Sequence, residues 1–168
     1  MKLALAALAL CALAACSPEA ASGDPSTVDR ALAWDAPAAE RVDCSELFAE
    51  WSDGADGSPA ACWRYTGPFG VNEQFPAQLA SFTEQIDAEP VSDARCMPHA
   101  SGTMFSCGSV WEADGGYLLL LSGVNIEGLR EAIDNPDADD LVHELTVWVS
   151  DTDPRTDGAL DYLSAPLP

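Results

Sequence analysis

The sequence contains few cations and few histidines. Its 7 Lys and Arg face 28 Asp and Glu, which gives a formal charge of −21, and its only lysine is Lys2. Nucleic-acid binding requires clustered cations, whereas the arginines here are scattered along the chain. The composition therefore argues against a nucleic-acid partner. It favours attraction to cationic proteins or divalent ions and repulsion from anionic lipid headgroups.

Recognisable catalytic motifs are also missing. There is no G-x-S-x-G nucleophile elbow and no cofactor-binding motif, so we expect no cofactor. His99 is interpreted as a solvated turn residue and His143 as a hydrogen-bonded histidine at a strand edge. The acidic stretches 134–140 and 151–161 offer carboxylates to calcium. With Asp153 as position 1 of an EF-hand-like loop, however, Arg155 falls at position 3 and Ser164 at position 12, where an EF-hand needs ligands. We therefore predict no metal site.

The N-terminal apolar run is too short to cross a bilayer. One Lys precedes about a dozen apolar residues in MKLALAALALCALAA, the pattern of a signal peptide over residues 1–15. Leu13-Ala14-Ala15-Cys16 resembles the lipobox of bacterial lipoproteins. The alternative is an ordinary cleaved signal peptide in which Cys16 occurs by chance.

The lipobox resemblance implies a specific address. Cys16 would become the first mature residue, with a diacylglyceryl thioether on its sulfur and usually a third acyl chain, such as palmitate, on its amino group. Several acyl chains anchor a protein stably, whereas one chain binds reversibly. In enteric bacteria an Asp after this cysteine retains the protein on the inner membrane. Since Ser17 stands here, the outer membrane is favoured, with the domain facing the periplasm or the exterior.

Composition along the chain predicts three regions. Residues 1–15 are the signal peptide, and residues 16–40, rich in Ala, Pro, Ser and acids, are the lipidated cysteine and a flexible tether in which only Leu32 and Trp34 hint at packing. Residues 41–168 are expected to form a single domain.

Four cysteines follow Cys16, and an even number in an exported chain favours disulfides. Three pairings are open, and order along the chain favours Cys44–Cys62 and Cys96–Cys107. The second pair lies symmetrically about Ser101-Gly102, a plausible hairpin tip. A zinc site at Cys96, His99 and Cys107 is the less favoured alternative, because no fourth ligand has matching spacing.

Periodicity predicts the elements of the domain. The pattern of Cys44, Leu47, Phe48 and Trp51 after Asp43 indicates a first helix. Further elements follow it: a strand over 61–66, a helix with Phe75, Leu79, Phe82 and Ile86 on one stripe, a hairpin turning at Asp114-Gly115, a helix after Asn125 and a strand over 144–150. Pairing about the turn sets Trp111 opposite Leu118, and the apolar run 118–121 should be central.

After the first helix this order is β-α-β-β-α-β, which predicts a small two-layer α+β sandwich of ferredoxin-like order, stabilised by two disulfides. In that topology the helices cover one sheet face. The opposite face is covered by the first helix or left open as a binding surface that includes Trp63, Tyr65, Trp111 and Trp148.

These patterns predict a lipid-anchored cell-envelope protein with a non-catalytic binding or accessory domain. Its expected partners are the membrane, through the anchor, and another envelope protein; its oligomeric state is left open. The alternative function is a small periplasmic hydrolase whose acid and base residues the sequence does not identify.

Overall fold

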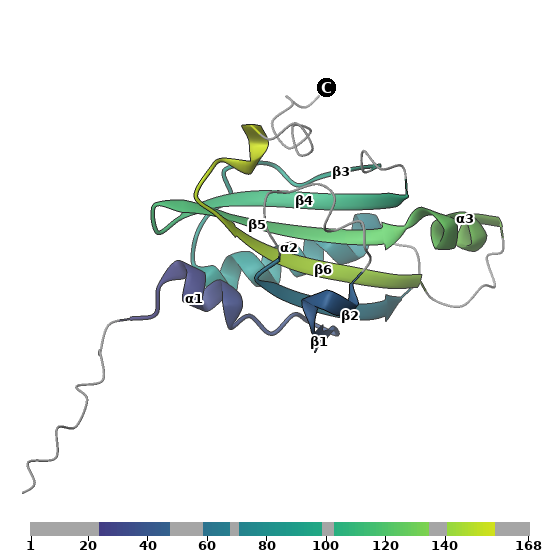
Figure 1. The fold of residues 1–168 in the computed structure, drawn as a ribbon, viewed down its shortest axis with the longest axis horizontal. Coiled ribbons are helices and arrows are strands. Elements are labelled where there is room, and N and C mark those ends of the chain that lie inside the picture. The colour runs from purple at the N-terminus through teal and green to yellow at the C-terminus, as the bar shows by residue number, and fades with distance from the viewer. Residues whose placement is uncertain (1–23, 48–58, 68–70, 99–102, 135–140, 157–168) are drawn as a thin grey trace, which may run out of the picture.

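A six-stranded antiparallel sheet organises the protein (Figure 1). The computed structural model describes residues 24–47, 59–67, 71–98, 103–134 and 141–156. The strand order across the sheet is β1-β2-β6-β5-β4-β3. The strands are β1 (Glu40–Val42), β2 (Ala61–Gly67), β3 (Arg95–Pro98), β4 (Met104–Ala113), β5 (Gly116–Asn125) and β6 (Leu141–Ser150). The helices are α1 (Thr27–Leu32), α2 (Val71–Ile86) and α3 (Ile126–Asp134), with 3-10 turns at η1 (Cys44–Glu46) and η3 (Pro154–Thr156).

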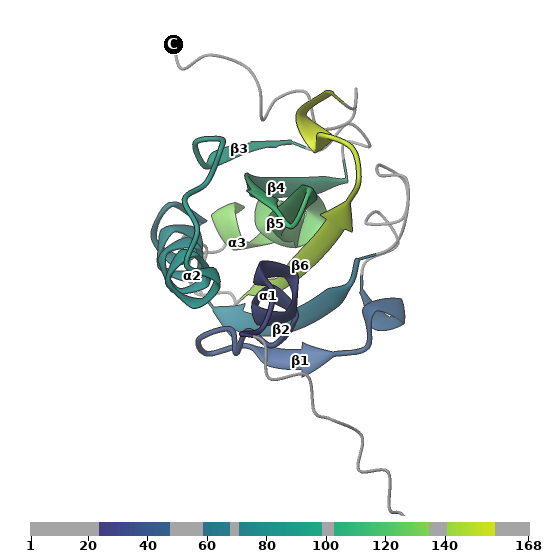
Figure 2. The same ribbon diagram turned by 90° about the vertical axis from the view of Figure 1, so that its left-hand side faces the viewer.

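The sheet curves around α2, which lies against its concave face together with α1 (Figure 2). We call this the helix face; it carries Leu118, Leu120, Leu145 and Val147. The opposite face carries Val110, Leu119, Leu121 and Trp148, which form a second buried cluster. The sheet is therefore apolar on both sides, as its buried central strands require.

Local pairing confirms the predicted hairpin. Asp114 and Gly115 both have positive φ, 53° and 84°, as a type I′ turn demands, and Trp111 lies opposite Leu118. Leu118 to Leu121 are all at most 4% exposed, so β5 is covered on both faces. Cys96 lies opposite Cys107, the register expected for a hairpin centred on Ser101-Gly102, although residues 99–102 lie outside the described part.

The predicted stripe of α2 also faces the core. Phe75, Phe82 and Ile86 are 2%, 0% and 0% exposed, and Leu79 packs against the same cluster. Asp87 ends the helix in the left-handed region with φ 52°, and its amide donates to the carbonyl of Thr83. Asn125 caps α3, since its side-chain oxygen accepts from the amide of Glu127 at 2.8 Å.

The fold is mixed α+β with two disulfides, but the ferredoxin-like strand order is not confirmed. That order places the strand over 61–66 beside the strand over 116–123. Instead β6 lies between them and pairs with β2 on one side and β5 on the other. The physical reason is that both faces of β6 are buried, with Leu145 and Val147 on one face and Thr146 and Trp148 on the other. A strand of this kind is stable only at the centre of a sheet.

The folded region begins before residue 41. Residues 27–32, assigned to the flexible tether by the sequence, form α1, and the side chain of Ser26 caps it in a capping box with Asp29. Trp34 is 2% exposed and packs edge-to-face on Trp63 and Phe82, each with ring centroids 5.1 Å away. The tether prediction is therefore wrong for residues 27–40, because one buried tryptophan outweighs the polar composition around it.

Only the first residues of the helix predicted after Asp43 lie in the described part of the chain, and they form a 3-10 turn. Residues 44–46 form the single turn η1, which Asp43 caps by accepting from the amide of Ser45, while Phe48 and Trp51 lie outside the described part. Within the described residues, no helix is both long and apolar enough to cross a membrane.

Candidate functional site

The four aromatic residues predicted to share a binding surface do not lie together on an exposed face. Trp63, Tyr65 and Trp111 point into the helix face and are 1%, 9% and 0% exposed. Trp148 points to the opposite face and is 5% exposed. The first three side chains are buried under the helices, and Trp148 is buried in the second apolar cluster. All four are therefore core residues. The structure therefore gives no open aromatic surface here.

Three buried polar side chains meet within the helix face. The ring of Tyr65 stacks on His143 with centroids 4.5 Å apart and planes 6° apart, as expected for directly opposite residues on β2 and β6. The hydroxyls of Tyr65 and Ser122 are hydrogen-bonded, and burial raises the pKa of the Tyr65 phenol above its usual value. His143 is 1% exposed and pairs with Tyr65 on one side and Val124 on the other, so the expected edge position is corrected to a buried position on the central strand β6.

This cluster contains the side-chain types of a hydrolase but not the access. Ser122 is 3% exposed and His143 1% exposed, so neither reaches solvent in this structure. A nucleophile and its base must lie within hydrogen-bond reach of a bound substrate. The cluster is therefore arranged as a polar element of the core, and it gives the alternative hydrolase function no support.

The polar row continues from Ser122 to a disulfide at the sheet edge. Ser122 on β5 lies directly opposite Cys107 on β4, and Cys107 lies opposite Cys96 on β3. Cys96 and Cys107 are bonded, with Cα atoms 3.9 Å apart, which confirms the favoured pairing and removes both thiols as zinc ligands. A disulfide, a serine hydroxyl and a Tyr–His stack thus occupy neighbouring positions on one face.

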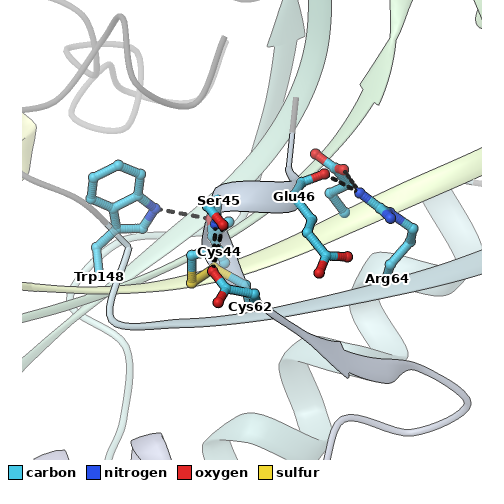
Figure 3. Close-up of a disulfide and its surroundings, with 9 residues drawn as sticks. Cys44, Ser45, Glu46, Cys62, Arg64 and Trp148 are labelled. Carbon is cyan, nitrogen blue, oxygen red and sulfur yellow. Dashed lines mark hydrogen bonds and ion pairs between the residues drawn. A yellow bond between two sulfur atoms is a disulfide. The ribbon is translucent and has the colours of Figure 1, made fainter. Parts of the chain in front are cut away.

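A buried ion pair lies on the opposite face (Figure 3). Arg64 and Glu144 are directly opposite on β2 and β6, and Nη2 of Arg64 lies 2.9 Å from Oε1 of Glu144. The same nitrogen donates to the carbonyl of Glu46 in η1. The Glu144 side chain is fully buried, whereas that of Arg64 is 33% exposed. Arg64 thus neutralises a buried carboxylate and fastens η1 to the sheet.

The second disulfide reinforces this attachment. Cys44 in η1 is bonded to Cys62 on β2, as the sequence favoured, and Trp148 lies on the same side of the sheet (Figure 3). The indole Nε1 of Trp148 donates to Oγ1 of Thr146 at 2.9 Å, and Thr146 is directly opposite Cys62. Leu47 packs against the Trp148 cluster. The start of the predicted first helix therefore covers part of this face, as one alternative held.

In the calcium-like stretch, Arg155 forms an ion pair with Asp153, the residue at position 1 of the EF-hand alignment. Nη2 of Arg155 lies 2.6 Å from Oδ2 of Asp153, and this pairing lowers the pKa of the Asp153 carboxyl below its usual value. The two residues at loop positions 1 and 3 thus bond each other. Among the described residues, no group of three or more His, Cys, Asp or Glu side chains is arranged to hold a metal ion.

Sequence reasoning missed Ser122 and Glu144. Both are polar residues within strands, and a polar residue in a strand is normally predicted to face solvent or to lie at the end of the strand. For Glu144, the available signal is an arginine within another predicted strand, Arg64, which supplies the opposite charge. The searches with protein-family models, against curated proteins and against solved structures found no match to this chain.

Proposed function

We propose that the protein is a lipid-anchored cell-envelope protein whose domain binds another envelope protein. The observation that supports the lipid anchor is the pairing of the other cysteines. All four cysteines after Cys16 are paired with one another in two disulfides, so none of them is left to pair with Cys16. Lipidation requires a lipobox cysteine whose thiol is free to react, and disulfides fit an oxidising envelope compartment.

The arginines support a cationic partner. Four of the six donate to backbone carbonyls of other segments, so these side chains tie parts of the fold together: Arg30 to Ile86, Arg41 to Leu32, Arg64 to Glu46 and Arg155 to Val91. Two of these, Arg64 and Arg155, also pair with carboxylates. The chain has 28 Asp and Glu against 7 Lys and Arg, so negative charge remains in large excess, and such a surface associates with positively charged proteins.

Anchoring is tested by labelling cells with a palmitate analogue and comparing wild type with Cys16→Ser. The proposal expects label and detergent-phase partitioning in wild type and neither in the variant. Cys11→Ser is the matched control, because Cys11 lies in the cleaved segment and should leave both unchanged. Retention of label in Cys16→Ser would overturn the lipid anchor.

Partner binding is tested by cross-linking in intact cells and purification through a C-terminal tag. We expect a stoichiometric partner with a basic surface, and weaker capture as salt rises, because screening weakens exposed charge pairs. Replacing the exposed Glu84 and Glu89 by Gln should weaken capture more than replacing the exposed Glu127 and Glu131 on α3 if the α2 side is the interface. Salt-independent capture of an acidic protein would contradict a charge-based interaction.

A further inference from the structure

The two disulfides differ in how they meet solvent and in how firmly their outer ends are held. Each joins a buried sheet cysteine to a cysteine at the periphery: Cys62 is 1% exposed and Cys107 0%. Their partners differ, because Cys44 is half-buried and Cys96 is exposed. The residue of this disulfide that faces solvent is therefore Cys96, whereas Cys107 is fully buried and shielded from an attacking thiolate.

The segments that carry the outer cysteines are also unlike each other. Cys44 lies in η1, which is fixed by the Asp43 cap, by the bond from Arg64 to the carbonyl of Glu46, and by packing of Leu47. Cys96 lies in β3, a strand of four residues at the edge of the sheet whose one neighbour among the described strands is β4. Short edge strands open locally at lower free energy than central elements. Opening of β3 would present the sulfur of Cys96 to an attacking group.

We propose that Cys96–Cys107 is a thiol-exchange site of the domain and that its ligand is a thiolate. The thiolate sulfur forms a bond to Sγ of Cys96, the Cys96–Cys107 bond breaks, and its electron pair remains on Sγ of Cys107. The proton released by the incoming thiol ends on solvent or on Cys107. A dithiol reagent completes the reaction when its second thiol displaces Cys96, so the disulfide is reduced and the dithiol is oxidised.

Ser122 is the positioning residue for this step. It lies directly opposite Cys107 on the same sheet face, and opposite side chains of antiparallel strands have Cβ atoms about 5 Å apart. Its hydroxyl can rotate to donate to the thiolate that forms on Cys107, because hydroxyl orientation adapts to the acceptor. Tyr65 supplies the hydroxyl with a second hydrogen-bond partner. Stabilising the leaving thiolate speeds exchange.

The test exposes the folded, oxidised protein to graded glutathione without denaturant, followed by acid quench, alkylation and peptide mass mapping. We expect glutathione on Cys96, and roughly tenfold faster opening of Cys96–Cys107 than of Cys44–Cys62. Glutathione on Cys107, or opening of Cys44–Cys62 at the same or a greater rate, would overturn the proposal. A second arm with a reduced thioredoxin-type protein shows whether a protein dithiol opens the bond faster than the small thiol.

The role of Ser122 is tested with Ser122→Ala, and Thr146→Val is the matched control opposite Cys62. We expect the alanine variant to slow opening of Cys96–Cys107 several-fold and the valine variant to leave that rate unchanged. Equal rates in Ser122→Ala and wild type would remove Ser122 from the step. The glutathione experiment on the wild-type protein tests the exchange site by itself, so the proposal can still be overturned if a variant fails to fold. Neither experiment depends on lipidation of Cys16.

Discussion

Arg64 and Glu144 face each other across β2 and β6, with 2.9 Å between Nη2 and Oε1, and this pair neutralises a fully buried carboxylate. Removal of the arginine would leave that carboxylate without its charge partner. We expect Arg64→Met to lower the free energy of unfolding by about 3 kcal/mol, the lower end of the cost of breaking a buried pair, because Arg64 is partly exposed. Urea unfolding with both disulfides intact measures this loss.

The matched control is Arg130→Met, since Arg130 is exposed on α3, and we expect a change within about 0.5 kcal/mol. The double variant Arg64→Met with Glu144→Met should be more stable than Arg64→Met alone, because apolar side chains can replace a buried pair. A double variant that is less stable than the single one would show that Glu144 also makes stabilising contacts with groups other than Arg64.

The sequence predicts the parts of this fold that depend on nearby residues. The Asp114-Gly115 hairpin, the Cys96 and Cys107 register and the α2 stripe are each specified by residues close along the chain. The pairing of β2 with β6 joins residues about 80 positions apart, and no local pattern specifies it. The buried polar residues Ser122 and Glu144 were missed for the same reason, since their partners come from distant strands.

Trp34 tests whether the N-terminal segment belongs to the domain. It contacts Trp63 and Phe82, and its Nε1 donates to Oγ of Ser81 at 3.2 Å. We expect Trp34→Ala to lower the free energy of unfolding by about 3–5 kcal/mol through loss of buried area and the cavity left behind. The adjacent exposed Asp35→Ala is the control, with an expected change within about 0.5 kcal/mol. Equal stability of both variants would restore the tether interpretation for this segment.

Gly115 and Gly116 are constrained for different reasons, Gly116 by a close backbone contact and Gly115 by its positive φ. A Cβ at Gly116 would lie 2.7 Å from the carbonyl oxygen of Ser150, and this backbone atom cannot move without disturbing the β5–β6 pairing. Gly115 has open space but a φ of 84°. We expect Gly115→Ala to cost about 1–2 kcal/mol from the left-handed backbone, and Gly116→Ala to cost more. Thermal unfolding of both variants gives the order, and a smaller loss at Gly116 would contradict the close approach.

Tyr65 predicts how stability changes at alkaline pH. Burial raises the pKa of its phenol above the usual 10.0, so between these two values the folded protein holds a proton that the unfolded chain has lost. The contribution of this tyrosine is therefore fully present below pH 10 and is lost as pH rises through the folded-state pKa.

Tyr65→Phe removes this titration along with the Ser122 hydrogen bond. Its free energy of unfolding should start lower at pH 8 and fall less steeply above about pH 10. Urea unfolding across this range, with tyrosinate absorbance recorded in parallel, measures both effects, and Tyr117→Phe is the control because Tyr117 is only half-buried. Equal alkaline slopes in wild type and Tyr65→Phe would show that Tyr65 ionises as readily in the folded protein as in the unfolded chain.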